Sequence, residues 1–448
     1  MAASLQRLDL RPVQGDVGPH LPRPEVAGAG PVAAVREILA QVRDGGDQAV
    51  RDLTERFDGV RIDSLLVPRA EVEAGLKAIP GNLRDALEAA ASAITAYHRT
   101  QLPTGDQSER QSEHQTEHQT EHETERDGIT IRDLRRPLHR AGLYVPGGRA
   151  RYPSTVLMTA LPARVAGVPE VILCVPPDKD GTVNPPALAA AALAGVDEVY
   201  RIGGAQAVAA MAYGTETIRP VDVIVGPGNA YVSIAKREVA QEGRVAVTSA
   251  FAGPSEVVVI ADETTPVDAA AIDLIVQAEH GPDGLAWLVT WSEDAADRIT
   301  AAVDRLTQQA ARRGEIESTL AKNGYCVLVT GPQQAMAVAN AVAPEHLELM
   351  SADPESLVAL VDNAGAVFCG PYAPASVGDY IAGPSHVLPT DRTARFASGL
   401  RVDDFCKHIH VVSLDRPALA KVAPHIVAIA EAEGLAAHAD SVRTRETL

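Results

Sequence analysis

The sequence has few cysteines and few aromatic residues. Aromatic residues make up 4% of the 448 positions, and the spacings of the four cysteines match no metal-binding pattern. Three of these cysteines lie in or beside strand-like apolar runs, which indicates reduced core residues in a cytoplasmic protein rather than disulfides. The four are Cys174, Cys326, Cys369 and Cys406.

Positive charge and long apolar runs are also scarce. The formal net charge is −19 at pH 7, which argues against a nucleic-acid partner and against binding to an anionic membrane. No apolar run reaches 18 residues, so we expect no membrane-spanning helix, and the N-terminus lacks the apolar core of a signal peptide. With 46% hydrophobic residues, the chain can bury the cores of two or three domains.

The first 140 residues divide into an arm and a helical region. Residues 1–30 are rich in proline and glycine and are interpreted as an N-terminal arm. Residues 28–33 match the dinucleotide pattern G-x-G-x-x-A, but no strand precedes them, so we reject that match. Residues 31–140 carry apolar side chains at helical spacing, which predicts three helices, with Asp47 capping the second and Phe57 on its buried face.

A low-complexity insert interrupts the helical region at residues 104–127. Its four-residue repeat would align three histidines on a helix, where they could chelate a metal. The same helix would align mutually repelling glutamates, and the insert has no apolar residue to bury. We therefore expect the insert to be disordered. The histidines are His114, His118 and His122.

From residue 141 the sequence alternates between strand-like and helix-like segments. This alternation predicts parallel sheets covered by helices on both faces. One series fills residues 141–250, a second fills residues 251–385, and residues 386–448 remain as a C-terminal tail. The predicted fold is α/β, with two sequential Rossmann-like parallel-sheet units after an N-terminal helical region. The expected strands are 142–145, 171–175, 198–202, 221–225, 257–261, 285–290, 326–330 and 366–369.

Glycine clusters follow three strands of the first series, at Gly147, Gly203 and Gly226. The carboxyl ends of parallel strands share one edge of a sheet, and nucleotides bind at that edge in open α/β folds. Glycine also permits close approach of the backbone to a phosphate or a ring. Three such turns at one edge predict a cofactor crevice.

Polar residues at two places in the second series have spacings typical of a catalytic site. Gln277 and His280 lie three apart, so on a helix a carbonyl oxygen and an imidazole would share one face and could bind zinc. The alternative is an ordinary helix end with a polar tip. Glu345 and His346 are adjacent, and because neighbours on a strand face opposite ways, we place them on a turn as two proton-transfer groups.

Two further polar clusters lie toward the C-terminus. Asp379 and His386 occur in one Gly/Pro-rich stretch, and Glu433 and His438 lie near the end of the chain. Either cluster alone is also compatible with a solvated loop.

Seven long strings in these regions resemble the histidinol dehydrogenase family. They extend, in order, through most of the chain after residue 141, whereas the arm and the insert depart from the family pattern without touching a motif. The strings are GGAQ at 203–206, VGPGN at 225–229, FAGPSE at 251–256, QAEHG at 277–281, PEHLE at 344–348, GDY at 378–380 and GPSH at 383–386.

The resemblance implies a cytoplasmic homodimer that oxidises L-histidinol to L-histidine through L-histidinaldehyde, with NAD and one zinc ion per site. The C-terminal tail is expected to contribute to dimerisation and to reach the partner's site. The implied zinc ligands are Gln277, His280, Asp379 and His438, the last from the tail of the partner subunit. The implied NAD contacts are Tyr144, Gln206 and Asn229. The implied substrate contacts, besides the metal ligands, are Ser255, His346 and Glu433, and the proton-transfer pair is Glu345 and His346.

The chemistry of the residues agrees with this implication. Histidinol offers an amine and an imidazole, both of which are zinc ligands, so the metal is expected mainly to orient the substrate. His346 can accept the hydroxyl proton, and Glu345 can activate water for addition to the aldehyde. Two alternatives are a related zinc-dependent dehydrogenase of another amino or hydroxy alcohol and a catalytically silent paralogue. The latter would be expected to have lost Glu345 or His346.

Overall fold

The computed structural model describes residues 5–22, 31–103, 120–147, 151–248, 255–279 and 284–446. The chain forms two compact units, of which the larger combines Met1–Arg99 with His139–Asp404, and the smaller combines Thr100–Leu138 with Phe405–Leu448. The helical region ends at Arg99, and only the part of the tail after Asp404 belongs to the smaller unit.

The first sheet of the larger unit has five parallel strands. They are β4 (Arg140–Tyr144), β5 (Glu170–Cys174), β6 (Glu198–Tyr200), β7 (Val223–Val225) and β8 (Ala246–Val247). Their order is β6-β5-β4-β7-β8, so the strand order reverses direction between β4 and β7. The connecting helices are α4 (Pro153–Ala166), α5 (Pro185–Leu193), α6 (Gly204–Tyr213) and α7 (Ala230–Gln241).

Three N-terminal helices precede this sheet: α1 (Val32–Asp58), α2 (Arg69–Ala78) and α3 (Gly81–Arg99). As predicted, α1 is interrupted between its two halves, at Gly46, which has a φ of 52°. The prediction that Asp47 caps the second half is wrong, because its carboxylate accepts the Thr217 N–H (3.3 Å) from another element. Phe57 is also 49% exposed rather than buried.

The second sheet has six parallel strands. They are β1 (Gln6–Asp9), β9 (Glu256–Ala261), β10 (Leu285–Thr290), β11 (Gly324–Leu328), β12 (His346–Met350) and β13 (Ala366–Cys369). The order is β1-β11-β10-β9-β12-β13, so strands β9 to β13 repeat the arrangement of the first sheet and β1 is added at the β11 edge. The arm was therefore wrongly read as lacking a strand, and His346 begins a strand rather than lying on a turn.

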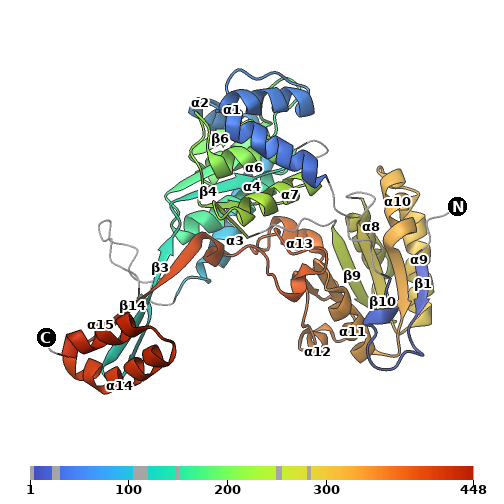
Figure 1. Cartoon of the computed structure of the whole chain (residues 1–448). Coiled ribbons are helices and arrows are strands. Elements are labelled where there is room, and N and C mark those ends of the chain that lie inside the picture. Colours follow the sequence, from blue (N-terminus) through green and yellow to red (C-terminus); the bar gives the residue numbers. More distant parts are fainter. Residues whose placement is uncertain are drawn as a thin grey trace. The chain divides into compact units, whose positions relative to one another are not determined.

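Helices cover both faces of the second sheet (Figure 1). They are α8 (Val267–Ala278), α9 (Glu293–Thr307), α10 (Arg313–Asn323), α11 (Pro332–Val342), α12 (Pro354–Val358) and α13 (Ala375–Tyr380), with 3-10 turns at Gly18–His20, Thr393–Arg395 and Val402–Phe405. Side chains alternate along β9, so Val257 and Val259 pack with α8, α9 and α10. Val258 and Ile260 pack with α11 on the other face.

The smaller unit contains an antiparallel sheet and two helices. Its strands are β2 (Thr120–Arg126), β3 (Ile129–Pro137) and β14 (Cys406–Leu414), in the order β14-β3-β2, and its helices are α14 (Arg416–Ala432) and α15 (Ala436–Glu446). The predicted disordered insert falls largely on residues 104–119, which lie outside the described residues. Its last part was predicted wrongly, because residues 120–126 form β2, which pairs with β3.

Candidate active site

A cavity of about 770 Å³ lies at the carboxyl edge of the first sheet. Its walls come from α1 and from the segments that follow β4, β5, β6 and β7, around the point where the strand order reverses. All three predicted cofactor contacts, Tyr144, Gln206 and Asn229, line this cavity. Dinucleotides bind in such a crevice in doubly wound sheets.

The polar groups of this cavity are positioned by the neighbouring turns. The Tyr144 hydroxyl oxygen accepts the Gly204 N–H (3.1 Å), and Asn229 caps α7 by accepting the Val232 N–H (3.1 Å). Burial raises the pKa of Tyr144 to about 12, so its hydroxyl stays neutral. Within the described part of the chain, Oε1 and Nε2 of Gln206 are buried without a hydrogen-bond partner. A polar ligand would satisfy both atoms, so the cavity fits a nicotinamide dinucleotide.

A second cluster of polar residues lies at the amino edge of the second sheet. Gln277, one residue before the end of α8, places Nε2 at 3.1 Å from Nδ1 of His346, the first residue of β12. An oxygen of Glu345 lies 3.5 Å from the same Nδ1, and Oδ1 of Asp379, on α13, lies 3.6 Å from His346 Nε2. The structure thus brings four of the predicted site residues together.

The surroundings of His346 determine which ring nitrogen carries the proton. The Glu256 carbonyl oxygen lies 3.2 Å from Nδ1 and can only accept, whereas the Gln277 amide nitrogen could only donate to an unprotonated Nδ1. The two acceptors near Nδ1, the Glu256 carbonyl and the Glu345 carboxylate, stabilise a proton there more than the single Gln277 amide donor disfavours it. In the neutral ring Nε2 then carries the lone pair, and it is buried without a hydrogen-bond partner among the described residues.

The proton affinities of this cluster are strongly perturbed. Burial disfavours the charged form of His346, but the carboxylates of Glu345 and Asp379 outweigh this effect and raise its pKa to about 9. Burial raises the pKa of Glu345 to about 7. Glu345 therefore exchanges protons near neutral pH, whereas the neutral form of His346, which can act as a base, becomes the main species only as the pH approaches 9.

Gln277 and Asp379 also fit a divalent cation. Gln277 is buried, and its Oε1 has no hydrogen-bond partner in the described part of the chain. An amide oxygen and a carboxylate are oxygen ligands that zinc accepts. The described residues contain no group of three His, Cys, Asp or Glu side chains placed to hold a metal, so these two residues alone do not complete a site. Nearby, Nε2 of His386 lies 3.0 Å from Thr155 Oγ1, and its Nδ1 lies 2.9 Å from the Asp379 carbonyl oxygen. These two contacts fix the Asp379 segment.

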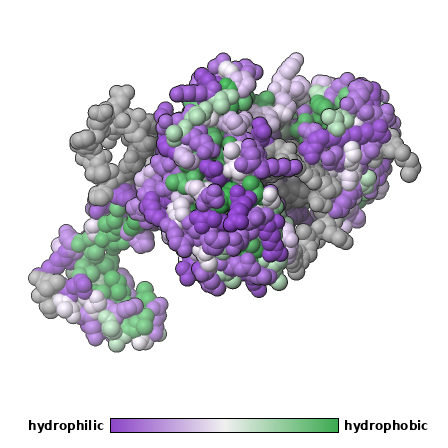
Figure 2. Space-filling view, turned by 90° about the horizontal axis from the view of Figure 1, so that it is seen from above, coloured by the Kyte–Doolittle hydropathy of each residue, from purple (hydrophilic) through white to green (hydrophobic). Residues whose placement is uncertain are grey.

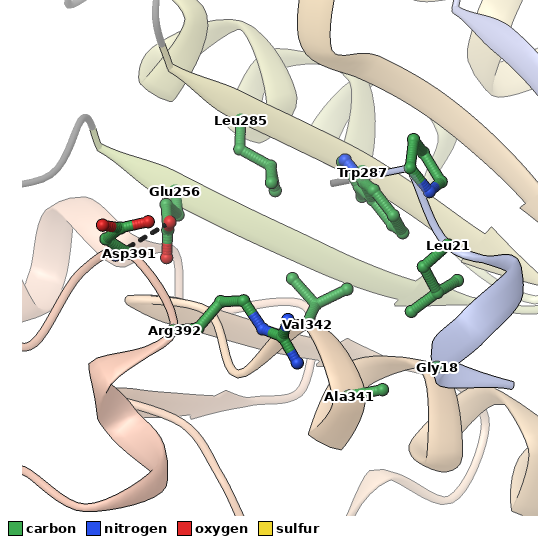
Figure 3. A pocket seen from close by; sticks show the side chains of 10 residues that line it. Gly18, Leu21, Glu256, Leu285, Trp287, Ala341, Val342, Asp391 and Arg392 are labelled. Carbon is green, nitrogen blue, oxygen red and sulfur yellow. Dashed lines mark hydrogen bonds between the residues drawn. The ribbon is translucent and has the colours of Figure 1, made fainter. Parts of the chain in front are cut away.

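Glu256 connects this cluster to the opposite face of the sheet. Its N–H donates to Glu345 Oε2 (3.1 Å), and its own carboxylate accepts the N–H groups of Glu345 (3.2 Å) and Asp391 (3.1 Å). Figure 3 shows this carboxylate on one wall of a largely apolar cavity of about 160 Å³, with Trp287 on another wall and Arg392 extended toward Val342. Burial, and then the charge of Glu345, raise the pKa of Glu256 to about 8.

Comparison with known proteins identifies the family. The family model for histidinol dehydrogenase matches residues 22–446. The chain belongs to the histidinol dehydrogenase family. It is 47% identical to the histidinol dehydrogenase of Parasynechococcus marenigrum over 408 residues, covering 91% of this chain and 89% of the relative. It is 44% identical to that of Methanothermobacter thermautotrophicus, covering 93% of each chain. The crystal structure of histidinol dehydrogenase from Elizabethkingia anophelis has a TM-score of 0.89 at 33% identity, covering 98% of each chain.

Members of the histidinol dehydrogenase family oxidise histidinol to histidine with NAD and use zinc. The remaining site residues that the resemblance implies are not gathered in the described cluster. Ser255 directly precedes β9, and its carbonyl accepts the Leu285 N–H (3.0 Å). His280 lies outside the described residues. Glu433 and His438 are exposed on the smaller unit, in α14–α15.

Sequence reasoning missed two residues of these sites. Glu256 was treated only as part of a motif, although a carboxylate that opens an otherwise apolar buried strand is an unusual feature. Asp58, which lines the cofactor cavity from the end of α1, gave no signal because its helix is far from the sheet in sequence.

Proposed function

We propose that this chain oxidises L-histidinol to L-histidine in two successive steps, with NAD as oxidant and one zinc ion per site. The observation that supports this best is the buried cluster of Gln277, Glu345, His346 and Asp379. It combines an oxygen-rich metal donor set with a carboxylate and an imidazole 3.5 Å apart, the two kinds of group that general acid–base catalysis requires.

In this proposal Gln277, His280 and Asp379, with His438 of the partner subunit, hold the zinc ion. The support in the structure is the buried Gln277 Oε1, which has no hydrogen-bond partner in the described part of the chain. When bound, zinc orients the amine and imidazole of histidinol. Ser255 and Glu433 are proposed as further substrate contacts, and a carboxylate such as Glu433 suits a cationic amine.

His346 acts as the base in the oxidation of the alcohol. Its Nε2 takes the hydroxyl proton, while Nδ1–H is held by the Glu256 carbonyl oxygen (3.2 Å). Bound NAD, contacted by Tyr144, Gln206 and Asn229, supplies the hydride acceptor in both oxidations.

Glu345 acts in the oxidation of the aldehyde. Its carboxylate removes a proton from the water that adds to the aldehyde carbon, and the resulting hydrate is oxidised to the carboxylic acid. The overall reaction consumes one water and reduces two NAD. Because Glu345 lies 3.5 Å from His346 Nδ1, protons can pass between the two residues. Retention of the reactive aldehyde through both steps prevents its loss to water.

We infer that the functional form is a homodimer in which the smaller unit of one chain completes the partner's site. The supporting observation is a group of exposed apolar side chains on β3, β14 and the following helices, visible as a hydrophobic surface over this unit in Figure 2. Exposed apolar patches mark protein contacts in soluble chains. They are Ile131, Ile409, Val412, Leu414, Ile426, Ile429 and Leu435.

We further propose that the enzyme works in the cytoplasm without a nucleic-acid partner, as its net charge of −19 suggests. In the part of the chain that the structure describes, no helix is long and apolar enough to cross a membrane.

The direct test is NADH formation from L-histidinol by the purified protein. We expect two NADH per histidinol consumed, loss of turnover in a chelator and recovery with Zn²⁺. Faster turnover of another amino alcohol would contradict the substrate assignment, and full activity in the chelator would contradict the zinc assignment.

A further inference from the structure

A carboxylate faces the cofactor cavity from a helix outside the sheet. Asp58 is the last residue of α1 and lines the same cavity as Tyr144, Gln206 and Asn229. Its Oδ2 is buried and has no hydrogen-bond partner among the described residues. It is close enough to Tyr144 for its negative charge to raise the pKa of that hydroxyl further. The Oδ2 atom of the partly exposed Asp58 is therefore a buried acceptor without a donor among the described residues.

The position of the cavity indicates which half of the dinucleotide Asp58 would meet. Apart from Asn229 and Tyr231, the sheet side of the cavity is formed by the segments after β4, β5 and β6, on one side of the point where the strand order reverses. In doubly wound sheets each half of the dinucleotide lies over one half of the sheet, and the half over the first three strands receives the adenosine. The exposed rings of Phe57 (49%) and Tyr231 (44%) border the cavity and offer flat surfaces for adenine.

We propose that Asp58 makes the enzyme selective for NAD over NADP, by accepting a hydrogen bond from the adenosine ribose and repelling a 2′-phosphate. This proposal rests on the proposed function, because it takes the cavity of Tyr144, Gln206 and Asn229 as the cofactor site. Asp58 is a specificity determinant and takes no part in hydride or proton transfer.

The charges around the cavity support this selection. Burial raises the pKa of Asp58 to about 6, so the group is mostly ionised above neutral pH. A 2′-phosphate would bring about −1.5 to −2 further charges next to it. Among the described lining residues, Lys179 is the only cation, and it is exposed beside Asp178. One solvated ammonium is suited to the diphosphate that NAD and NADP share, so Lys179 does not discriminate between the two cofactors.

The test compares equilibrium binding of ADP-ribose with that of its 2′-phosphate by titration calorimetry, together with kcat/KM for NAD and NADP. In the wild type we expect ADP-ribose to bind more tightly. Asp58→Asn keeps the shape and removes the charge, and we expect the preference for ADP-ribose to fall by about tenfold or more, which corresponds to one close charge pair. In this variant ADP-ribose should bind more weakly and its 2′-phosphate more tightly than in the wild type. The ratio of kcat/KM for NAD to that for NADP should fall in parallel.

Two variants make the result specific. Asp52→Asn removes a charge from the same helix at an exposed residue that does not line the cavity, and its preference should stay at the wild-type value. Gln206→Ala should weaken both ligands equally. If Gln206→Ala weakens binding while Asp58→Asn leaves the preference unchanged, the selectivity proposal is overturned and the cofactor site stands. If neither variant affects binding, the proposed cofactor site itself is wrong. If Asp58→Asn does not fold, the same binding comparison is made with Asp58→Ser.

Discussion

The two parallel sheets of the larger unit share one five-strand order, to which the second adds β1, but their candidate functional groups lie at opposite edges. In the first sheet the cavity with Tyr144 and Asn229 lies at the carboxyl edge. In the second sheet Glu256 and His346 are the first residues of β9 and β12, so the polar cluster lies at the amino edge. Gln277 joins them because α8 runs back from the carboxyl end of β9 to its amino end. Strand order therefore predicts where a nucleotide site lies, but not which edge carries chemistry.

The carboxyl edge of the second sheet is closed by its own loops. Asp262 follows β9 there, and its carboxylate accepts the N–H groups of Thr264 (2.9 Å) and Ala352 (2.7 Å). The Thr264 hydroxyl donates to the same carboxylate (2.6 Å). The position that opens onto a cavity in the first sheet is thus used in the second to fix two turns.

The largest expected effect concerns how many chains build each site. We propose that the amino-edge site requires the partner's tail, whereas the cofactor cavity is built within one chain. His346→Ala and His438→Ala homodimers should each be nearly inactive. When both are unfolded, mixed and refolded, half of the dimers are mixed and one of their two sites is intact, so about a quarter of wild-type activity should return. A mixture as inactive as its parents would mean that each chain's own tail closes its site.

A smaller effect is a difference between the alcohol and the aldehyde oxidation when one residue of the amino-edge cluster is changed. Glu345→Gln removes the base that activates water, so aldehyde oxidation should fall by about hundredfold while alcohol oxidation falls much less. The two half-reactions can be followed separately, with histidinol and with histidinaldehyde as substrate. Equal damage to both would reject a role for Glu345 confined to the water step.

A third variant compares the two ends of β9 directly. Glu256 holds Glu345 and Asp391 through both oxygens of its carboxylate, and an amide can accept from only one of these N–H groups. Glu256→Gln should therefore lower kcat by about tenfold, the equivalent of one hydrogen bond, with little change in either KM. Asp262→Asn, at the other end of the strand, should lower the melting temperature and leave kcat near wild type. A loss of kcat in both variants would indicate a general effect of distorting β9.

The smallest effect concerns stability at the cofactor edge. Burial raises the pKa of Asp58 from 3.8 to about 6, so the unfolded chain ionises first and stability falls as pH rises between these values. Asp58→Asn should remove that loss. We expect it to stabilise the ligand-free protein by about 1 kcal/mol above pH 7, after discounting for partial exposure, and to have no effect below pH 4. Denaturant unfolding at both pH values measures this, and equal stabilisation at both would contradict a charge effect.

The sequence predicts continuously apolar strands well and strands that contain polar or charged residues poorly. Runs such as 257–261 and 171–175 are continuously apolar because both faces of a parallel sheet are covered, and the structure confirms them as β9 and β5. Six strands were missed, namely β1, β2, β3, β8, β12 and β14, and three of them show the physical reasons. β12 opens with a polar residue of the site, β1 lies alone in a segment rich in proline, and β3 is half exposed with charged residues between apolar ones. β1 pairs with β11 and β3 pairs with β14, both of which are distant in sequence, and local pattern does not report such pairing.

The candidate sites divide in the same way. The motifs were sufficient to name Glu345, His346, Gln277 and Asp379, but their contacts come from β12, α8 and α13, which only the fold brings together. The edge at which they meet could not be predicted, because His346 was expected on a turn. His280 and the partner's His438 remain predictions.

The central claim is that the first sheet binds the cofactor and the amino edge of the second performs the chemistry. Steady-state kinetics of Gln206→Ala and His346→Ala test this claim most directly. Gln206→Ala should raise the KM for NAD by about tenfold and leave kcat at saturating NAD near wild type, as expected for loss of uniform binding. His346→Ala should lower kcat by about a thousandfold, within the range for loss of a general base, and leave the KM for NAD unchanged. The reverse pattern, with His346→Ala altering NAD binding and Gln206→Ala altering only kcat, would contradict this division of roles.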